Sequence, residues 1–254
     1  MIKKIAVANQ KGGIGKTTTA TTLAAGLKNR GFNVLYIDCD PQRNSTSFYE
    51  AETEDTETLA DVLYDKLPAE KAIQTTNHGD IIASDIQLYQ ADSIIPADVD
   101  RFYKLGDALR PLENKYDYFI FDTPPSNGVL LGNVLCYADE VIMPTTADGF
   151  GIQGMLDFYN SMGSYSKRIN PNIHISGVLI IKYKGRQNLT KQIEDVILPD
   201  LASEMKTKLY KTRIRESVKI PESQTLRQNI FDYDKNSTTA IDYNLFIEEY
   251  LKDK

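Results

Sequence analysis

Residues 11–18, KGGIGKTT, combine glycines, lysines and threonines in the spacing that binds a polyphosphate. An apolar run at residues 2–8 precedes them, and a helical pattern of threonine, alanine and leucine begins at Lys16. A strand, a glycine loop and a helix start make up a P-loop, in which backbone N–H groups and the positive end of the helix dipole face the phosphates. Lys16 is expected to reach the β and γ phosphates, the Thr17 hydroxyl to ligate Mg²⁺, and the Thr18 hydroxyl to donate to the α phosphate.

The glycines of this loop let its backbone approach the phosphates, because they carry no Cβ atom. The general pattern GxxxxGK[ST] asks for glycine where this chain has Gln10, and an extra lysine, Lys11, stands before the first glycine. The alternative is a Gly/Thr-rich turn with surface lysines, but the strand, loop and helix context favours the phosphate site. The residues expected to contact the nucleotide are Lys11, Gly12, Gly13, Ile14, Gly15, Lys16, Thr17 and Thr18.

Acidic residues follow two further apolar segments. Residues 33–38 predict a buried strand, and Asp38 and Asp40 at its end are two positions apart, which places both carboxylates on one side. Residues 116–126, YDYFIFDTPPS, predict another strand, with Asp122 at its carboxyl end to hold a Mg²⁺-bound water. Ligands of a doubly wound sheet bind beyond the carboxyl ends of its strands, so these acids are expected to face the phosphates. The alternative is that Asp40 only caps the proline-containing turn.

Three segments together resemble the ParA/MinD family of ATPases: KGGIGKTT its deviant Walker A motif, DCDPQ at residues 38–42 its second motif, and DTPPS at residues 122–126 its γ-phosphate switch. The resemblance covers almost the whole chain and implies ATP and Mg²⁺ as cofactors. It implies that two ATP-loaded subunits meet face to face, with Lys11 crossing to the partner's nucleotide. Asp38 would approach Mg²⁺ through water, and Asp40 would orient the attacking water. The expected catalytic residues are Lys11, Lys16 and Asp40, and the expected metal-site residues are Thr17, Asp38 and Asp122.

The composition is consistent with a folded enzyme. Of the 254 residues, 41% are apolar and 25% are charged, which excludes a disordered or collagen-like chain. We expect residues 1–254 to form a single P-loop ATPase domain. The chain has neither a signal-peptide pattern nor an apolar run of about 18 residues, so a cytoplasmic protein that does not span a membrane is expected. Cys39 and Cys136 are expected to be free thiols, because two cysteines in apolar settings do not make a disulfide framework or a zinc site.

The expected fold class is α/β, a doubly wound, mainly parallel sheet with helices on both faces. Beyond the segments above, strands are predicted within residues 79–84, 138–148 and 173–183, and helices within residues 58–67, 97–109, 129–137, 150–169 and 237–251. In the last helix, Ile241, Leu245, Phe246 and Leu251 are expected to form the apolar face.

Basic residues gather in two places late in the chain. The net charge is −6, so any nucleic-acid binding requires a local patch. Lysine and arginine are frequent within residues 182–191 and again within residues 206–219, which contain a single acid. The plain interpretation is a solvated helix face and a strand end. The family resemblance instead implies a non-specific DNA surface at Arg186 and Lys219, and Arg215 in the same cluster is expected to join them.

Several functions are compatible with an ATPase of this family. The first is DNA partition, in which the ATP dimer binds duplex DNA of the nucleoid and a ParB-like centromere-binding protein triggers hydrolysis. A MinD-like membrane ATPase would need a basic amphipathic C-terminus, whereas this chain ends IEEYLKDK, with three acids in eight residues. A reductase of the nitrogenase iron-protein type would need two cluster-binding cysteines in Gly-rich loops. Positioning of a non-DNA cargo remains an open alternative.

Two further expectations follow from the resemblance. Because the P-loop lies at the start of the chain, an additional N-terminal DNA-reading domain is not expected. The family pattern near Glu222 usually continues Glu-Ala-Pro, whereas this chain has Glu222, Ser223 and Gln224, so the loop on the adenine side is expected to differ in detail.

Overall fold

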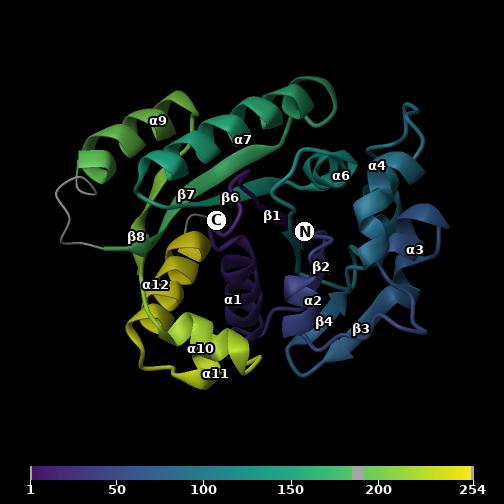
Figure 1. Cartoon of the computed structure of the whole chain (residues 1–254), viewed down its shortest axis with the longest axis horizontal. Coiled ribbons are helices and arrows are strands. Elements are labelled where there is room, and N and C mark those ends of the chain that lie inside the picture. Colours follow the sequence, from purple (N-terminus) through teal and green to yellow (C-terminus); the bar gives the residue numbers. More distant parts are fainter. Residues whose placement is uncertain (1, 185–191, 253–254) are drawn as a thin grey trace.

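The computed structural model describes residues 2–184 and 192–252 of the chain. These residues form an eight-stranded sheet in the order β3-β4-β2-β5-β1-β6-β7-β8 (Figure 1). The strands are β1 (Lys3–Val7), β2 (Val34–Asp38), β3 (Ile73–Thr76), β4 (Gly79–Ile82), β5 (Tyr118–Asp122), β6 (Glu140–Thr145), β7 (His174–Tyr183) and β8 (Leu209–Arg215). Only the β3–β4 pair is antiparallel among the described strands. The predicted mainly parallel α/β sheet is therefore confirmed.

Helices cover both faces of the sheet, as predicted (Figure 1). The α-helices are α1 (Lys16–Lys28), α2 (Asn44–Phe48), α3 (Leu59–Tyr64), α4 (Ala91–Ile94), α5 (Lys104–Leu109), α6 (Val129–Tyr137), α7 (Gly149–Arg168), α9 (Leu198–Glu204), α10 (Lys219–Thr225), α11 (Ile230–Tyr233) and α12 (Thr238–Lys252). Shorter helical turns are η1 (Ala69–Ala72), η2 (Ile86–Gln90), η3 (Arg110–Leu112) and η4 (Ile193–Ile197). No helix in the described part of the chain is long and apolar enough to cross a membrane.

The central strand β5 shows why both faces need a cover. Side chains of a strand alternate between the two faces of its sheet. Ile120 lies in the same apolar cluster as Leu23 of α1. Phe119 and Phe121 lie in the opposite cluster, together with Phe158 of α7. The continuous apolar run at the centre of the sequence motif therefore packs on both sides, as expected for an inner parallel strand.

The strand register brings the sequence motifs to one edge of the sheet. Asp122 lies opposite Val7, the last residue of β1, and also opposite Asp38, the last residue of β2. The glycine loop leaves β1 at this edge and leads directly into α1. The loop and the carboxylates therefore meet because three parallel strands end at the same level.

Some elements differ from the sequence-based prediction. β3 and α2 were not expected, and the helix predicted within residues 97–109 begins only at Lys104. The basic stretch before Lys219 contains the edge strand β8, not a solvated helix face. In β8, Tyr210 and Ile214 are buried while Lys211 between them is exposed, so the charged positions alternate with core positions.

The apolar face predicted for the last helix, α12, is confirmed for Phe246, which is buried, and for Leu251, which packs against the same apolar cluster. Ile241 and Leu245 are 45% and 50% exposed, so their predicted burial is wrong. Tyr243 and Tyr250 are buried in their place. The Tyr243 hydroxyl lies 3.2 Å from the Thr19 hydroxyl of α1, so the buried ring keeps a polar partner.

Side chains of α12 also satisfy backbone donors of the edge strand β8. The Glu249 carboxylate accepts the backbone N–H of Lys211 at 2.7 Å and that of Thr212 at 2.9 Å. Asp242 accepts the backbone N–H of Arg215 at 3.0 Å. The helix is thus attached to the strand edge by hydrogen bonds as well as by apolar packing.

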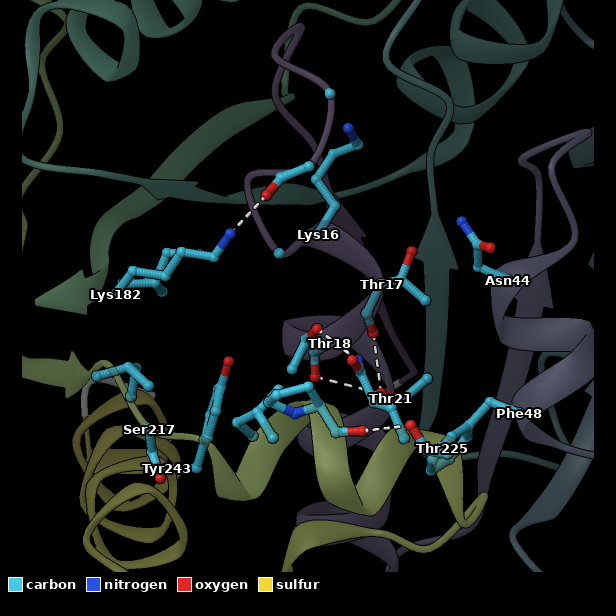
Figure 2. A pocket seen from close by; sticks show the side chains of 18 of the residues that line it. Lys16, Thr17, Thr18, Thr21, Asn44, Phe48, Lys182, Ser217, Thr225 and Tyr243 are labelled. Atoms are coloured by element: carbon cyan, nitrogen blue, oxygen red, sulfur yellow. Dashed lines mark hydrogen bonds between the residues drawn. The ribbon is translucent and has the colours of Figure 1, made fainter.

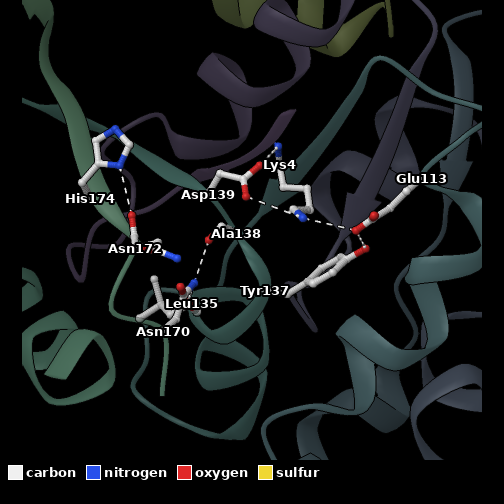
Figure 3. Close-up of polar contacts among 9 residues, drawn as sticks. All are labelled: Lys4, Glu113, Leu135, Tyr137, Ala138, Asp139, Asn170, Asn172 and His174. Atoms are coloured by element: carbon white, nitrogen blue, oxygen red, sulfur yellow. Dashed lines mark hydrogen bonds and ion pairs between the residues drawn. The ribbon is translucent and has the colours of Figure 1, made fainter. Parts of the chain in front are cut away.

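Polar contacts tie the amino end of β1 to its surroundings (Figure 3). The Lys4 ammonium lies 3.2 Å from a Glu113 oxygen and 3.6 Å from an Asp139 oxygen. The Tyr137 hydroxyl donates to the same Glu113 oxygen at 2.8 Å. His174, in the same view, begins β7 with a largely exposed side chain.

Candidate nucleotide-binding site

The loop between β1 and α1 has the backbone conformation of a phosphate cradle. Gly13 and Gly15 have φ angles of 67° and 82°, which glycine adopts without strain. A Cβ atom on Gly15 would lie 2.6 Å from Cδ1 of Ile181, so a larger residue would have to displace the end of that side chain as well as adopt the positive φ angle. The first N–H groups of α1, which starts at Lys16, have no partner within the helix and open toward the loop.

A cavity of about 800 Å³ opens in front of this loop (Figure 2). Its lining includes six of the eight residues predicted to contact the nucleotide: Gly12, Gly13, Gly15, Lys16, Thr17 and Thr18. Its other end is lined by Ile214 of β8, Ile220 of α10 and Tyr243 of α12. Ile14 is buried in an apolar cluster, so only its backbone could serve a ligand. Lys11 does not line the cavity.

Lys16 folds back over the loop that precedes it. Its ammonium donates to the Lys11 carbonyl at 3.2 Å, and the residue is only 6% exposed. Burial lowers the pKa of this ammonium, and the charges of Asp122 and Asp40 oppose the shift. A polyphosphate in the cavity would supply the anionic partner that favours the charged form of Lys16.

Asp38 has hydrogen bonds at both carboxylate oxygens. One oxygen accepts the backbone N–H of Thr46 at 2.9 Å and the Thr46 hydroxyl at 2.7 Å, and the other accepts the backbone N–H of Asp40 at 3.1 Å. Burial still raises the pKa of Asp38, although these hydrogen bonds oppose the shift. Asp38 therefore anchors the start of α2 and the segment that carries Asp40.

Asp122 is buried with one oxygen unpartnered. Its Oδ2 accepts the Ser45 hydroxyl at 3.1 Å, whereas its buried Oδ1 has no hydrogen-bond partner among the described residues. Burial, and then the charge of Asp38, raise the pKa of Asp122, while the hydroxyls of Thr17 and Ser45 oppose the shift. A buried carboxylate oxygen without a partner and with a raised pKa is what a bound cation would satisfy.

Asp40 caps the turn that follows it and also lines the cavity. Its Oδ1 accepts the backbone N–H of Gln42 at 3.0 Å, which is the turn-capping contact of the alternative interpretation. Its side chain also lines the cavity, and burial raises the pKa of its carboxyl group. The cap fixes the carboxylate in position without removing it from the cavity.

Lys11 points away from the phosphate loop of its own chain. Its ammonium lies 3.4 Å from Asp148 Oδ1 and 3.4 Å from the Thr146 hydroxyl. It also lies 5.4 Å from the centre of the Phe150 ring, and Phe150 is 79% exposed. Asp148, in turn, caps α7 by accepting the Gly151 N–H at 2.7 Å. Lys11 and Asp148 thus belong to one surface beside the cavity.

The three residues predicted to contact DNA have different surroundings. Arg215 forms a two-pronged ion pair with Asp242, with N···O distances of 2.9 and 2.6 Å. Lys219 lies 3.0 Å from Glu222, whose other contact is the Tyr233 hydroxyl at 2.9 Å. Arg186 lies outside the described residues. Arg215 is engaged within the chain, through an acid 27 positions away that the local charge pattern does not reveal.

We expect Asp242→Ala to lower the free energy of unfolding by about 2 kcal/mol, because it removes a buried carboxylate that accepts hydrogen bonds from the Arg215 guanidinium and from the Arg215 backbone N–H. Urea unfolding with an unchanged m-value measures the loss. Glu248→Ala is the matched control on the same helix, since Glu248 is half exposed and lies 4.0 Å from Arg30, so this pair should contribute less than about 0.5 kcal/mol. Equal losses in the two variants would contradict a structural role for the Arg215–Asp242 pair.

Three positioning residues were missed by the sequence analysis. Ser45 and Thr46 hold the two buried acids, but hydroxyls in a short polar segment give no periodic signal. Gln224 of α10 donates to the Thr18 hydroxyl at 2.7 Å. The departure from Glu-Ala-Pro at this point was the available sequence signal. The Gln224–Thr18 hydrogen bond brings α10 into direct contact with the start of α1.

The sequence of this chain is similar to those of known proteins over most of its length. Residues 2–175 match the family model described as "AAA domain". The chain is 35% identical over 243 residues to the sporulation initiation inhibitor protein Soj of Bacillus subtilis, covering 94% of each chain. It is 33% identical over 238 residues to the chromosome partitioning protein ParA of Caulobacter vibrioides, covering 92% of this chain and 88% of the other.

The chain belongs to the ParA/MinD family of P-loop ATPases. A solved structure with the same fold is described as cobyrinic acid a,c-diamide synthase from Mycobacterium smegmatis with bound ATP analogue and magnesium. It is 28% identical, has a TM-score of 0.81, and is matched over 99% of this chain and 95% of that one. ParA/MinD membership accounts for the three motifs and for their meeting at one edge of the sheet.

Proposed function

We propose that this ParA-like chain is a Mg²⁺-dependent ATPase that dimerises around ATP, binds duplex DNA without sequence preference and takes part in DNA segregation. The observation that carries the enzymatic part is the cavity that joins Lys16, Asp40 and the glycine loop. ATP and Mg²⁺ as ligands are supported by the ATP analogue and magnesium of the similar solved structure. Segregation is supported by the similarity to the ParA protein of Caulobacter vibrioides.

The acids at the strand ends fit a Mg²⁺ ion. The unpartnered Oδ1 of Asp122 and the hydroxyl of Thr17, which interacts with the same carboxyl group, are hard oxygen donors, the kind that Mg²⁺ prefers. Asp38 would act through a water or through its hydrogen bonds, since both of its oxygens are already engaged. Bound there with ATP, Mg²⁺ would neutralise charge on the β and γ phosphates.

In the proposed reaction, a water attacks the γ phosphorus and the bond to the β-phosphate oxygen breaks, which gives ADP and phosphate. Asp40 would orient that water and accept its proton, because its capped carboxylate is held at the cavity wall. Lys16 and the loop N–H groups would stabilise the negative charge on the phosphates.

We propose that Lys11 acts on the nucleotide of a partner subunit. Its ammonium lies outside its own cavity, against Asp148 at the exposed start of α7. On dimerisation, Lys11 would give up this exposed ion pair and bind a phosphate of the partner's nucleotide. A charge-assisted hydrogen bond to phosphate is stronger than an exposed ion pair.

DNA binding is the part of the proposal that Lys219 tests. In the ATP dimer, Lys219→Ala should reduce the affinity for every duplex alike. It should also lower the slope of log affinity against log salt by about 2, because one phosphate contact is lost in each of the two subunits. Glu222→Gln should act in the opposite direction, since Glu222 pairs with Lys219 at 3.0 Å and competes with DNA for it. Fluorescence anisotropy with two unrelated duplexes over a salt series measures both effects.

The matched control for this titration is Lys28→Ala, an exposed lysine at the end of α1 whose ammonium contacts a backbone carbonyl. Its salt slope should equal that of the wild type. If Lys219→Ala and Glu222→Gln also leave the slope and affinity unchanged, the DNA proposal for this surface fails. The remaining alternative is then an ATPase that positions a non-DNA cargo with its partner protein.

A further inference from the structure

A second lysine reaches the phosphate loop from the neighbouring strand. Lys182 lies at the carboxyl end of β7, and its ammonium donates to the Gly13 carbonyl at 2.9 Å (Figure 2). The residue has a φ angle of 52°, in the left-handed region that residues other than glycine adopt rarely. An uncommon backbone conformation beside a ligand cavity is often retained for function.

The contact belongs to a wider junction between β7 and the loop. Ile181, the preceding residue, packs so closely on Gly15 that a Cβ there would overlap it at 2.6 Å. Both Ile181 and Lys182 line the cavity. The end of β7 thus touches the loop by an apolar contact at one glycine and by a charged hydrogen bond at another.

Two ammonium groups therefore hold carbonyl oxygens of the same loop. Lys16 donates to the Lys11 carbonyl at 3.2 Å, and Lys182 donates to the Gly13 carbonyl at 2.9 Å. A hydrogen bond to a backbone C=O group fixes the plane of that peptide and so restricts the direction of the neighbouring N–H groups. These N–H groups form the anion cradle. Lys16 is expected to turn to the phosphates when ATP binds, which leaves Lys182 as the holder of the loop.

We propose that Lys182 is a positioning residue of the nucleotide site, which fixes the Gly13 peptide through its ammonium and forms part of the cavity wall with its methylene stem. This inference rests on the proposed function, because it requires that the cavity bind ATP. The two parts of the side chain have separable consequences. The ammonium should matter for the phosphates, and the stem should matter for whatever part of the nucleotide lies against it.

The test is competition of ATP, ADP and adenosine against a fluorescent ADP analogue in three variants. Lys182→Met keeps an unbranched stem without the ammonium, and we expect ATP and ADP to bind about tenfold more weakly with adenosine unchanged. Lys182→Arg can still donate to the Gly13 carbonyl and should stay within about threefold of the wild type. Lys184→Met is the control, because this nearby lysine pairs with Glu216 at 2.9 Å and does not line the cavity.

Hydrogen exchange of the ligand-free protein gives a second readout that needs no nucleotide. Amides of residues 12–15 should exchange faster in Lys182→Met than in the wild type, Lys182→Arg or Lys184→Met. Unchanged ADP affinity in Lys182→Met, or an equal loss for ADP and adenosine, would overturn the inference while wild-type binding stands. A wild-type protein that binds neither ATP nor ADP would instead overturn the proposed function.

Discussion

Lys16→Ala should lower ATP affinity by about two orders of magnitude or more, whereas Asp40→Ala should keep ATP binding and lower turnover by at least ~100-fold. The two effects separate because different atoms serve the two tasks. The Lys16 ammonium lies on the phosphate loop, while the Asp40 carboxylate is fixed by the Gln42 N–H at the cavity wall. Isothermal titration with ATP and Mg²⁺, and phosphate release under saturating ATP, measure binding and turnover independently.

Ser47→Ala is a suitable control for both variants, since Ser47 lines the same cavity and has no role in the proposed chemistry. It should change ATP affinity and turnover by less than about threefold. Equal losses of ATP affinity in Lys16→Ala and Asp40→Ala would contradict the assignment of Asp40 to the water. Normal turnover in Asp40→Ala would do the same.

Lys11→Ala should bind ATP as a monomer, fail to form the ATP dimer, and lose turnover by a factor on the order of 10³, as for a cation supplied in trans. The reason is its position, because the ammonium pairs with Asp148 at 3.4 Å outside the cavity of its own chain. Analytical ultracentrifugation with ADP and with a non-hydrolysable ATP analogue measures the dimer. Phosphate release measures turnover.

Lys167→Ala provides the control for Lys11, since it removes an exposed lysine from the last turn of α7, the end far from Asp148. It should sediment as a dimer with the ATP analogue and turn over like the wild type. If Lys11→Ala also dimerises and hydrolyses ATP normally, Lys11 is only a loop residue held by Asp148, and the proposal of a trans-acting lysine is wrong.

The parts of the fold that the sequence predicted are those with a strong local signal. β5 could be recognised because a strand buried on both faces is a continuous apolar run that ends in one acid, Asp122. α6 was predicted with its observed bounds, Val129–Tyr137, because its sequence is largely apolar. In the structure, seven of its nine residues are buried. The glycine loop was equally clear, since Gly13 and Gly15 need the backbone freedom that their positive φ angles show.

The parts that could not be predicted depend on distant partners. In β8, basic residues occur at every second position and only two side chains are buried, so the apolar pattern is weak. Its place at the sheet edge depends on β7 and α12. On α12, Tyr243 is buried with Thr19 as the polar partner of its hydroxyl, while Ile241 is exposed, a choice that hydrophobicity alone does not express. The ion pair of Arg215 with Asp242 could not be predicted, because Asp242 is remote in sequence and adjacent only in the fold.

For the candidate site, the sequence predicted the groups but not how they are held. The contacts of Asp38 with Thr46 and of Asp122 with Ser45 join segments that no motif connects. Lys182 and Gln224 approach the loop from β7 and α10, so their participation required the tertiary arrangement. The chemical groups of the loop are local in sequence, whereas these contacts to it come from elsewhere in the chain.

The attachment of α12 to β8 also restricts how copies of this protein can polymerise. A sheet grows across a molecular boundary when an incoming strand pairs with unoccupied backbone groups of an edge strand. At β8 the amides of Lys211, Thr212 and Arg215 are already bound to the Glu249 and Asp242 carboxylates, so an added strand would first have to displace the last helix. Any polymer of this protein would therefore have to grow through side-chain surfaces or at the opposite edge, β3, and not by extending the sheet past β8.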